Sequence, residues 1–210
     1  MVNQEQFWDG VAPKYAKSPI KNMEGYEYTL NQTRSFLKET DLVLEIGAGT
    51  GSTALALADS VAQIVATDIS EQMLAVGRIR AKEQGVKNIR FQRTEADRLP
   101  EGPFDAVMAH NVLHLVEDLP ATLRACHASL RPGGLLISKT FLKPTNGLQL
   151  MYRFMCLVLP IMQWLGKAPF VVFYSAQEFE RTIECAGFEI IETANYPATE
   201  ARRYIVARKR

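Results

Sequence analysis

The chain contains little cysteine and little histidine. Its 210 residues include 3 of each, and Cys126, Cys156 and Cys185 lie far apart without forming a Cys-x-x-Cys pair. This spacing predicts neither a disulfide framework nor a zinc site, and we expect no bound metal. Free cysteines suit a reducing compartment, so the sequence favours a cytoplasmic protein.

An excess of one charge is also absent. Lys and Arg total 24 against 23 Asp and Glu, which gives a net charge of +1. Because nucleic acids are bound through a strong basic field, this balance predicts no nucleic-acid partner. The basic residues 208–210 are more typical of a solvated tail. The first residues lack the basic and apolar regions of a signal peptide.

No apolar run is long and continuous enough to cross a bilayer. The densest stretch, residues 148–174, is interrupted by Gln149, Arg153 and Gln163. A transmembrane helix needs about 20 consecutive apolar residues, so the sequence predicts no spanning segment. Contact with the surface of a membrane stays open, and the sequence does not specify an oligomeric state.

What the sequence does contain is an alternation of strand-like and helix-like segments. Mostly apolar strands are predicted at residues 42–46, 63–67, 88–92, 104–109 and 135–138. Continuous apolar strands separated by helices are typical of a parallel sheet that is covered on both faces. We therefore predict an α/β fold, a doubly wound and mostly parallel seven-stranded sheet with helices on both faces.

This fold would form a single domain over residues 1–210. Residues 1–40 are expected to form an N-terminal helical cap, in which Pro13 and Pro19 limit helix length. Residues 142–174 are expected to form an apolar helical insertion after the fifth strand. The last two strands, at residues 188–193 and 203–207, would pair as a hairpin.

Local signals place several helix ends. Ser70 is a candidate N-cap for a helix that reaches about residue 84, and Ser175 with Glu178 forms a candidate capping box. The sequence Pro-Gly-Gly at residues 132–134 is expected to separate a helix that begins near residue 119 from the fifth strand. Pro160 is expected to break or kink the helix of the insertion into two pieces.

A glycine-dense turn follows the first strand. It consists of Gly47, Ala48, Gly49, Thr50 and Gly51. In doubly wound sheets the ligand lies beyond the carboxyl ends of the strands, so a nucleotide-like cofactor is expected here. Dinucleotide-binding turns have the spacing Gly-x-Gly-x-x-Gly, which this turn lacks. The preceding acid, Glu45, would repel a pyrophosphate but attract a cationic ligand.

Several stretches resemble the class I S-adenosylmethionine-dependent methyltransferase family of the small-molecule type. They are residues 45–51, 68–74, 95–100, 104–107, 112–115 and 130–134. Their order and spacing agree with the family over residues 5–140. The resemblance implies a Rossmann-like fold, methyltransferase activity and S-adenosylmethionine as the cofactor.

The resemblance also implies a set of cofactor-binding residues. These are Glu45, Gly47, Ala48, Gly49, Gly51, Asp68, Ile69, Met73, Glu95 and Ala96. In the family an acid at the position of Asp68 binds the ribose hydroxyls, and the next residue covers the adenine. Glu95 would accept a hydrogen bond from the adenine amine, although the family usually has Asp there, and Ala96 would supply backbone.

Two residues are candidates for a catalytic role. His110 follows the fourth strand, where cofactor and substrate meet, so it is a candidate for the cofactor site and for the general base that some acceptors require. Simple packing is the alternative. Tyr15 follows the residues Phe7, Trp8 and Asp9 in a pattern similar to the N-terminal cap of small-molecule members, where a tyrosine lies over the cofactor. Its alternative is an ordinary aromatic on a helix face.

Other polar residues favour structural roles. His114 is expected to be a core histidine, and His127 to be structural or on the surface. Asp105, at the start of a strand, is expected to be structural. The residues His110, Asn111, Val112 and Leu113 replace the Asn/Asp-Pro-Pro-Tyr/Phe run of many nucleic-acid methyltransferases, which argues against base flipping.

The apolar insertion indicates the class of methyl acceptor. Residues such as Phe154 and Met155 are expected to line an adaptable apolar pocket over the active site. A small lipophilic or aromatic acceptor is therefore the hypothesis, and a packing or dimer surface is its alternative. Two further functions compete, an NAD-dependent oxidoreductase and a non-catalytic S-adenosylmethionine-binding module. The spacing of the glycine turn and Glu45 count against the first.

Overall fold

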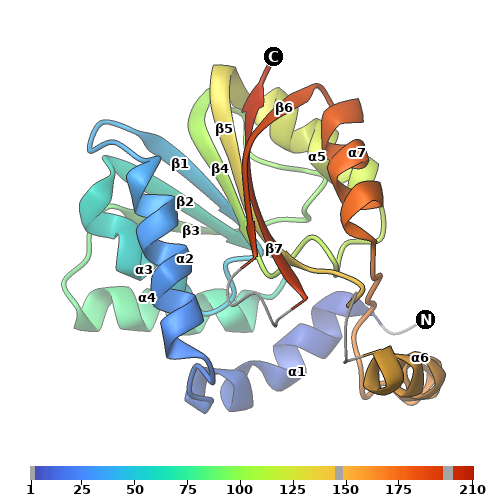
Figure 1. The fold of residues 1–210 in the computed structure, drawn as a ribbon. Coiled ribbons are helices and arrows are strands. Elements are labelled where there is room, and N and C mark those ends of the chain that lie inside the picture. The colour runs from blue at the N-terminus through green and yellow to red at the C-terminus, as the bar shows by residue number, and fades with distance from the viewer. Residues whose placement is uncertain (1–2, 145–148, 196–200) are drawn as a thin grey trace.

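The computed structural model describes residues 3–144, 149–195 and 201–210, and these form one layered α/β structure (Figure 1). The elements, in chain order, are α1 (Gln4–Lys17), α2 (Met23–Ser35), β1 (Leu42–Ile46), α3 (Ser52–Leu57), η1 (Ala58–Ser60), β2 (Gln63–Asp68), α4 (Glu71–Glu83), β3 (Ile89–Arg93), β4 (Phe104–His110), α5 (Leu119–Ser129), β5 (Leu130–Phe141), α6 (Gln149–Trp164), α7 (Ala176–Cys185), β6 (Phe188–Asn195) and β7 (Arg202–Lys209).

The sheet has seven strands in the order β3-β2-β1-β4-β5-β7-β6. β1 to β5 are parallel, whereas β7 is antiparallel to both β5 and β6. The predicted mostly parallel, doubly wound sheet and the predicted hairpin of the last two strands are confirmed. The strand order reverses at β1, between β2 and β4, so the carboxyl ends of these strands form the expected ligand edge.

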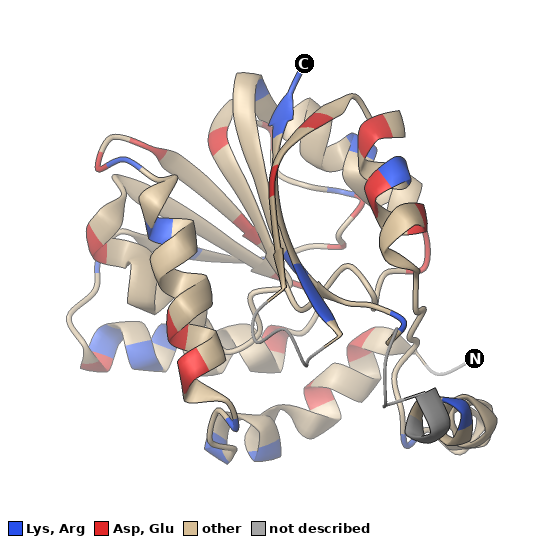
Figure 2. Ribbon diagram, in the orientation of Figure 1, with Lys and Arg blue, Asp and Glu red and all other residues tan. Residues whose placement is uncertain are grey.

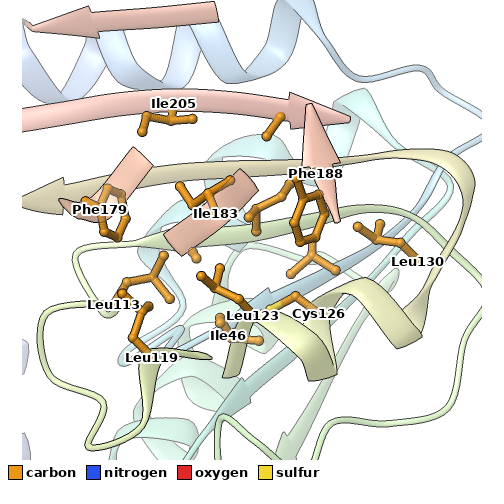
Figure 3. Close-up of a cluster of buried hydrophobic side chains, with 14 of the residues drawn as sticks. Ile46, Leu113, Leu119, Leu123, Cys126, Leu130, Phe179, Ile183, Phe188 and Ile205 are labelled. Atoms are coloured by element: carbon orange, nitrogen blue, oxygen red, sulfur yellow. The ribbon is translucent and has the colours of Figure 1, made fainter. Parts of the chain in front are cut away.

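Helices cover both faces of the sheet, as predicted. α5 and α7 cover one face, where Leu123, Phe179 and Ile183 share a buried core with Leu44 and Ile46 of β1. Figure 3 shows part of this core. α2 and α3 cover the other face, on which Val43 lies. Successive side chains of a strand point to opposite faces, so one short strand contributes to both cores.

The capping signals behave as the sequence predicts. Ser70 caps α4, since its hydroxyl accepts a hydrogen bond from the Met73 backbone N–H. Ser175 and Glu178 form a reciprocal capping box at the start of α7. Asp105 has a structural role, because its carboxylate accepts the Leu42 backbone N–H at 2.7 Å and pairs with Arg131 at 2.8 Å.

Three expectations about breaks in secondary structure are wrong. α1 continues through Pro13, and α6 continues through Pro160 without dividing into two pieces. A proline removes one backbone donor, and the flanking turns hold each helix together. β5 begins at Leu130 rather than at residue 135, because residues 130–134 form an irregular, bulged start to the strand, in which Gly133 has a φ of +73°.

α6 lies at the end of the sheet where the parallel strands finish, apart from the sheet itself (Figure 1). None of the described helices is long and apolar enough to cross a membrane.

Candidate active site

The carboxyl ends of β1, β2 and β4 meet at a cavity of about 1520 Å³. A pocket for one small ligand typically has about 300–1,000 Å³, so this cavity has room for a cofactor and a second molecule. All the residues predicted for cofactor binding or catalysis, except Gly51, line it. They are Tyr15, Glu45, Gly47, Ala48, Gly49, Asp68, Ile69, Met73, Glu95, Ala96 and His110.

Glu45, near the end of β1, brings a buried carboxyl group to this cavity. The side chain is 3% exposed, and its carboxylate accepts a hydrogen bond from the backbone N–H of Ala54. The Oε2 atom has no hydrogen-bond partner. Burial, and to a lesser extent the charge of Asp68, raises the pKa of Glu45 to about 8. A cation placed beside Oε2 would satisfy this oxygen and favour its ionised form.

Asp68, the last residue of β2, organises the glycine turn. Its Oδ2 accepts the backbone N–H of Gly49 at 2.8 Å, and its Oδ1 accepts that of Ser70 at 2.9 Å. Burial raises the pKa of this carboxyl, and the hydrogen bonds from the backbone oppose the shift. A carboxylate has about four lone-pair positions, so Asp68 retains capacity for ligand hydroxyls at the cavity.

The three glycines of the turn have different surroundings. All three have positive φ values. A Cβ at Gly49 would meet no atom within 4 Å, so this backbone borders open space in the cavity. A Cβ at Gly47 would instead collide with the side chain of Val112. Gly51 does not line the cavity, because a Cβ there would lie 2.8 Å from the Phe91 ring, and its role is close packing.

α1 is fixed across the cavity by polar contacts. Asp9 accepts a 2.6 Å hydrogen bond from the Ser70 hydroxyl and another from the Gln72 backbone N–H at 3.2 Å. Arg80 of α4 donates to the carbonyl oxygen of Ala16 at 2.6 Å and to the Thr50 hydroxyl at 2.9 Å. These contacts link α1 to the start of α4 and to the glycine turn. They place Tyr15, which is 54% exposed, at the cavity.

The segment after β3 forms another wall of the cavity. Glu95 and Ala96 line it together with Ile69 and Met73. The Glu95 carboxylate is exposed and lies 3.4 Å from the Arg98 guanidinium. Its contact with adenine remains a prediction from the family resemblance.

His110 lines the cavity beside Lys139, which lies on the neighbouring strand. Its Nε2 atom is 3.4 Å from the Thr33 hydroxyl. Burial, and then the charge of Lys139, lowers the pKa of His110 to about 4. The imidazole is therefore neutral at physiological pH and a weak base, so its predicted role as general base remains a proposal.

Lys139 itself is absent from the sequence prediction. It is 4% exposed and lines the cavity, and its ammonium donates to the Thr29 hydroxyl at 2.6 Å and to the Gly25 carbonyl at 3.1 Å. These bonds tie α2 to β5. The available signal was a lone charged residue within the otherwise uncharged residues 132–142, since buried charges are rare unless they are paired.

His114 also lines the cavity, contrary to its expected place in the core. Its Nδ1 atom has no hydrogen-bond partner. Burial and the nearby charge of Arg202 lower the pKa of His114 to about 4. His114 lies beside Phe141, with ring centroids 6.3 Å apart, and both line the cavity with Arg202.

None of the described residues of the insertion lines the cavity. The expectation that Phe154 contributes to the pocket is wrong for this structure, because Phe154 is 67% exposed. The insertion reaches the cavity wall through Phe173. Tyr152 packs on Phe173 with ring centroids 5.3 Å apart, and Phe173 packs on Phe141 at 6.0 Å.

Comparison with known proteins agrees with this geometry. Residues 43–134 match a family model described as a methyltransferase domain. The matched part of the chain is similar to the class I S-adenosylmethionine-dependent methyltransferases. The site has two features that fit S-adenosylmethionine. The Glu45 oxygen without a partner suits the ammonium group of S-adenosylmethionine. The open space beside the Gly49 backbone lets a ligand approach closely.

The chain resembles curated quinone methyltransferases over part of their length. It is 38% identical over 120 residues to a ubiquinone/menaquinone biosynthesis C-methyltransferase of Pseudomonas putida. The matched region covers 54% of this chain and 47% of the relative. The chain is 36% identical over 146 residues to the demethylmenaquinone methyltransferase of Mycolicibacterium gilvum, covering 67% and 61%. The chain thus spans about half to three fifths of the length of these relatives.

Solved structures share the fold of this chain at low identity. The magnesium protoporphyrin IX methyltransferase of Synechocystis has a TM-score of 0.72 at 18% identity, covering 98% of both chains. The [4+2]-cyclase SpnF has a TM-score of 0.76 at 18% identity, covering 98% of this chain and 94% of the cyclase. Since a cyclase and a methyltransferase share this fold, the fold alone does not fix the reaction.

Proposed function

We propose that the protein transfers a methyl group from S-adenosylmethionine to a lipophilic hydroxylated aromatic ring of the quinol class. The observation that carries the methyl-transfer part is the meeting of the partnerless Glu45 oxygen, the glycine turn and Asp68 in one cavity. The names of the curated relatives support the quinol part.

The cofactor end of the proposed site has a clear division of roles. Glu45 would hold the ammonium group of the amino acid part, and the backbone of Gly47 and Gly49 would border it. Asp68 would accept hydrogen bonds from the ribose hydroxyls while it keeps the turn in place. Ile69, Met73, Glu95 and Ala96 would surround the adenine. These roles follow the family resemblance, and the position of each residue at the cavity supports them.

When bound, S-adenosylmethionine supplies an electrophilic methyl group on a sulfonium. The chain's own contribution is to align the acceptor and to exclude water, and such positioning can be worth about 7–11 kcal/mol. α1 would cover the cofactor, with Tyr15 over the site. Because His110 is neutral, it would accept or donate a hydrogen bond rather than remove a proton from a weakly acidic acceptor.

The acceptor end combines apolar walls with positive charge. Phe141, Leu115 and Val116 line it together with Lys139 and Arg202. The cations favour an acceptor that carries a partly or fully ionised oxygen, and the apolar residues favour a hydrocarbon ring. A hydroxylated aromatic ring has both features. Ionisation of its hydroxyl also makes the neighbouring ring carbon more nucleophilic, so a strong protein base is not required.

The test is a transfer assay with methyl-labelled S-adenosylmethionine and a panel of acceptors. The panel contains prenylated and unprenylated 1,4-naphthoquinols, simple phenols, and small charged amines. We expect label in the naphthoquinols, with the prenylated form preferred. Label only in a small, highly charged metabolite would contradict the proposed acceptor class, and absence of transfer to every acceptor, in a protein that binds the cofactor, would favour a non-catalytic binding module.

A further inference from the structure

The outward side of α6 exposes a row of large apolar side chains. Phe154, Leu157, Ile161 and Trp164 are 67%, 74%, 59% and 84% exposed. Their spacing of three, four and three residues places them on one side of the helix. We call this row the α6 stripe. Monomeric soluble proteins seldom expose a contiguous set of this kind without an interaction to explain it.

The opposite side of α6 contacts the chain itself. The side chains on this side are half-buried and belong to Tyr152, Met155, Leu159 and Met162. Each precedes a residue of the α6 stripe by two positions, and residues two positions apart lie on opposite sides of a helix. Tyr152 packs on Phe173, and the Gln163 amide donates to the Pro169 carbonyl oxygen at 2.8 Å. The fold therefore uses one side of α6 and leaves the α6 stripe facing outward.

The chain segment that carries the stripe contains basic residues and no acidic ones. No Asp or Glu occurs between residues 119 and 177. Arg153 precedes the first stripe residue, and Lys167 follows the last by three positions; both are exposed. Figure 2 shows the described part of α6 without an acidic residue. An apolar stripe flanked by Lys and Arg and bounded by Trp and Phe is typical of a helix that lies in a membrane interface.

The length of α6 fits this arrangement. It has 16 residues, too few to span a bilayer of about 30 Å hydrocarbon thickness. Lying in the plane of the interface, the same helix presents its whole stripe to the acyl chains. We propose that α6 docks the enzyme on a bilayer that contains anionic lipid, with the α6 stripe among the acyl chains and Arg153 and Lys167 at the lipid phosphates.

Charge favours a lipid surface over a second copy of the chain. In a symmetric antiparallel pair of α6 helices, Arg153 of one copy would approach Lys167 of the other. The segment 119–177 contains no acid to compensate these like charges. Anionic headgroups supply that compensation, because basic residues near a bilayer surface are attracted to anionic lipids.

Docking through α6 would bring the cavity to the membrane. The Val172 backbone N–H donates to the His114 carbonyl oxygen at 2.8 Å, and Phe170 bonds to the Gln4 side chain of α1 at 3.1 Å. Phe173 contacts Phe141, which lines the cavity. A lipophilic acceptor would then reach the cavity from the bilayer. This last step rests on the proposed function, whereas the docking does not.

The experiment is sedimentation of the full chain with vesicles, either phosphatidylcholine alone or phosphatidylcholine mixed with phosphatidylglycerol. We expect binding to the mixed vesicles that is at least about ten-fold tighter than to phosphatidylcholine alone. The double variant Leu157→Gln/Trp164→Gln should lose at least about ten-fold in vesicle affinity. Ile79→Gln is the matched control, since Ile79 is 59% exposed on α4 and should leave binding unchanged.

Affinity for S-adenosylhomocysteine is measured on the same preparations. It should be equal in the wild type and the stripe variant, which verifies folding and separates docking from the cofactor site. Wild-type protein that ignores both vesicles, or a stripe variant that binds as well as the wild type, would overturn the docking proposal. If the wild type is a dimer and the stripe variant is a monomer, the α6 stripe binds a second copy of the chain. This result would also overturn the docking proposal. A wild type that binds the mixed vesicles but does not bind S-adenosylhomocysteine would instead contradict the proposed function.

Discussion

At the scale of single residues, Glu45 connects the sequence to the ligand most directly. A buried polar atom without a hydrogen bond costs free energy, and an unpaired buried carboxylate costs more. Here burial raises the pKa of the Glu45 carboxyl to about 8, so this group keeps a proton at neutral pH. This arrangement is unfavourable for the cofactor-free protein, but a cationic ligand converts it into a favourable ion pair.

Replacing Glu45 by Gln tests this interpretation through the number of protons released when the cofactor binds. Since Glu45 is protonated before binding and ionised beside a cation, cofactor binding at neutral pH should release close to one proton from the wild type. Titration calorimetry in buffers of different ionisation enthalpy measures that number. Glu45→Gln should release none from this site and should bind about ten- to a hundred-fold more weakly. Equal proton release by both proteins would refute a cation at Glu45.

Asp68 has two roles that different substitutions separate. Asp68→Ala removes the acceptor for the Gly49 and Ser70 backbone N–H groups, so it should lower stability by about 1–3 kcal/mol and weaken the cofactor about ten- to a hundred-fold. Asp68→Asn keeps one acceptor oxygen and should preserve more stability than affinity. Asp59→Asn, an exposed carboxyl on η1, is the control. Unchanged affinity in a folded Asp68→Ala protein would limit Asp68 to a structural role.

At the scale of elements, the glycine turn shows how far a motif can be interpreted. The spacing of its glycines predicted a ligand site, and two of the three glycines border the cavity. The third, Gly51, packs against Phe91 instead. The pattern could not separate these roles, because both require the absence of a Cβ, and only the position of β3 distinguishes them.

α6 gives the complementary lesson. The apolar pattern correctly predicted a helix, but it could not tell which apolar side would contact the fold. Both sides of α6 carry large apolar residues, so packing against Phe173 decides the orientation. The pattern therefore assigned Phe154 to the pocket, where the structure does not place it.

The anchoring of α1 supports a prediction about the cover of the cofactor. Asp9→Ala removes the contacts to Ser70 and Gln72, so α1 should open more often. Hydrogen exchange within α1 should become faster, and cofactor affinity should fall by about 1–2 kcal/mol. Lys14→Ala, an exposed change on the same helix, should do neither. Normal affinity with a loosened α1 would remove this helix from the cofactor site.

At the scale of the whole molecule, the sheet was predictable because its signals are local and periodic. Apolar strands alternate with helices, and the turn residues lie between them. The pairing of His110 with Lys139 was not predictable in the same way. It depends on the register between β4 and β5. Residues more than twenty positions apart along the chain together determine this register.

The buried histidines predict how stability depends on pH. The pKa values of His110 and His114 fall from 6.5 to about 4 on folding. Between these values the unfolded chain binds protons that the folded chain does not, so stability should fall as the pH is lowered from 6.5 toward 4, by up to about 1.4 kcal/mol per pH unit for each histidine.

Glu45 contributes a slope of the opposite sign, because its raised pKa makes stability fall as pH rises from 4.5 toward 8. Denaturant unfolding is therefore measured in the Glu45→Gln background, with and without His114→Phe. Removing His114 should flatten the acid slope. An unchanged slope would show that folding does not lower the pKa of His114.

We infer that this cavity is built for S-adenosylmethionine rather than for a dinucleotide. Titration calorimetry of the full chain with S-adenosylmethionine, S-adenosylhomocysteine and NAD tests it most directly. We predict saturable binding of the first two at one site, weakened in Glu45→Gln, and no comparable binding of NAD. Tight binding of NAD without binding of S-adenosylmethionine or S-adenosylhomocysteine would contradict the account.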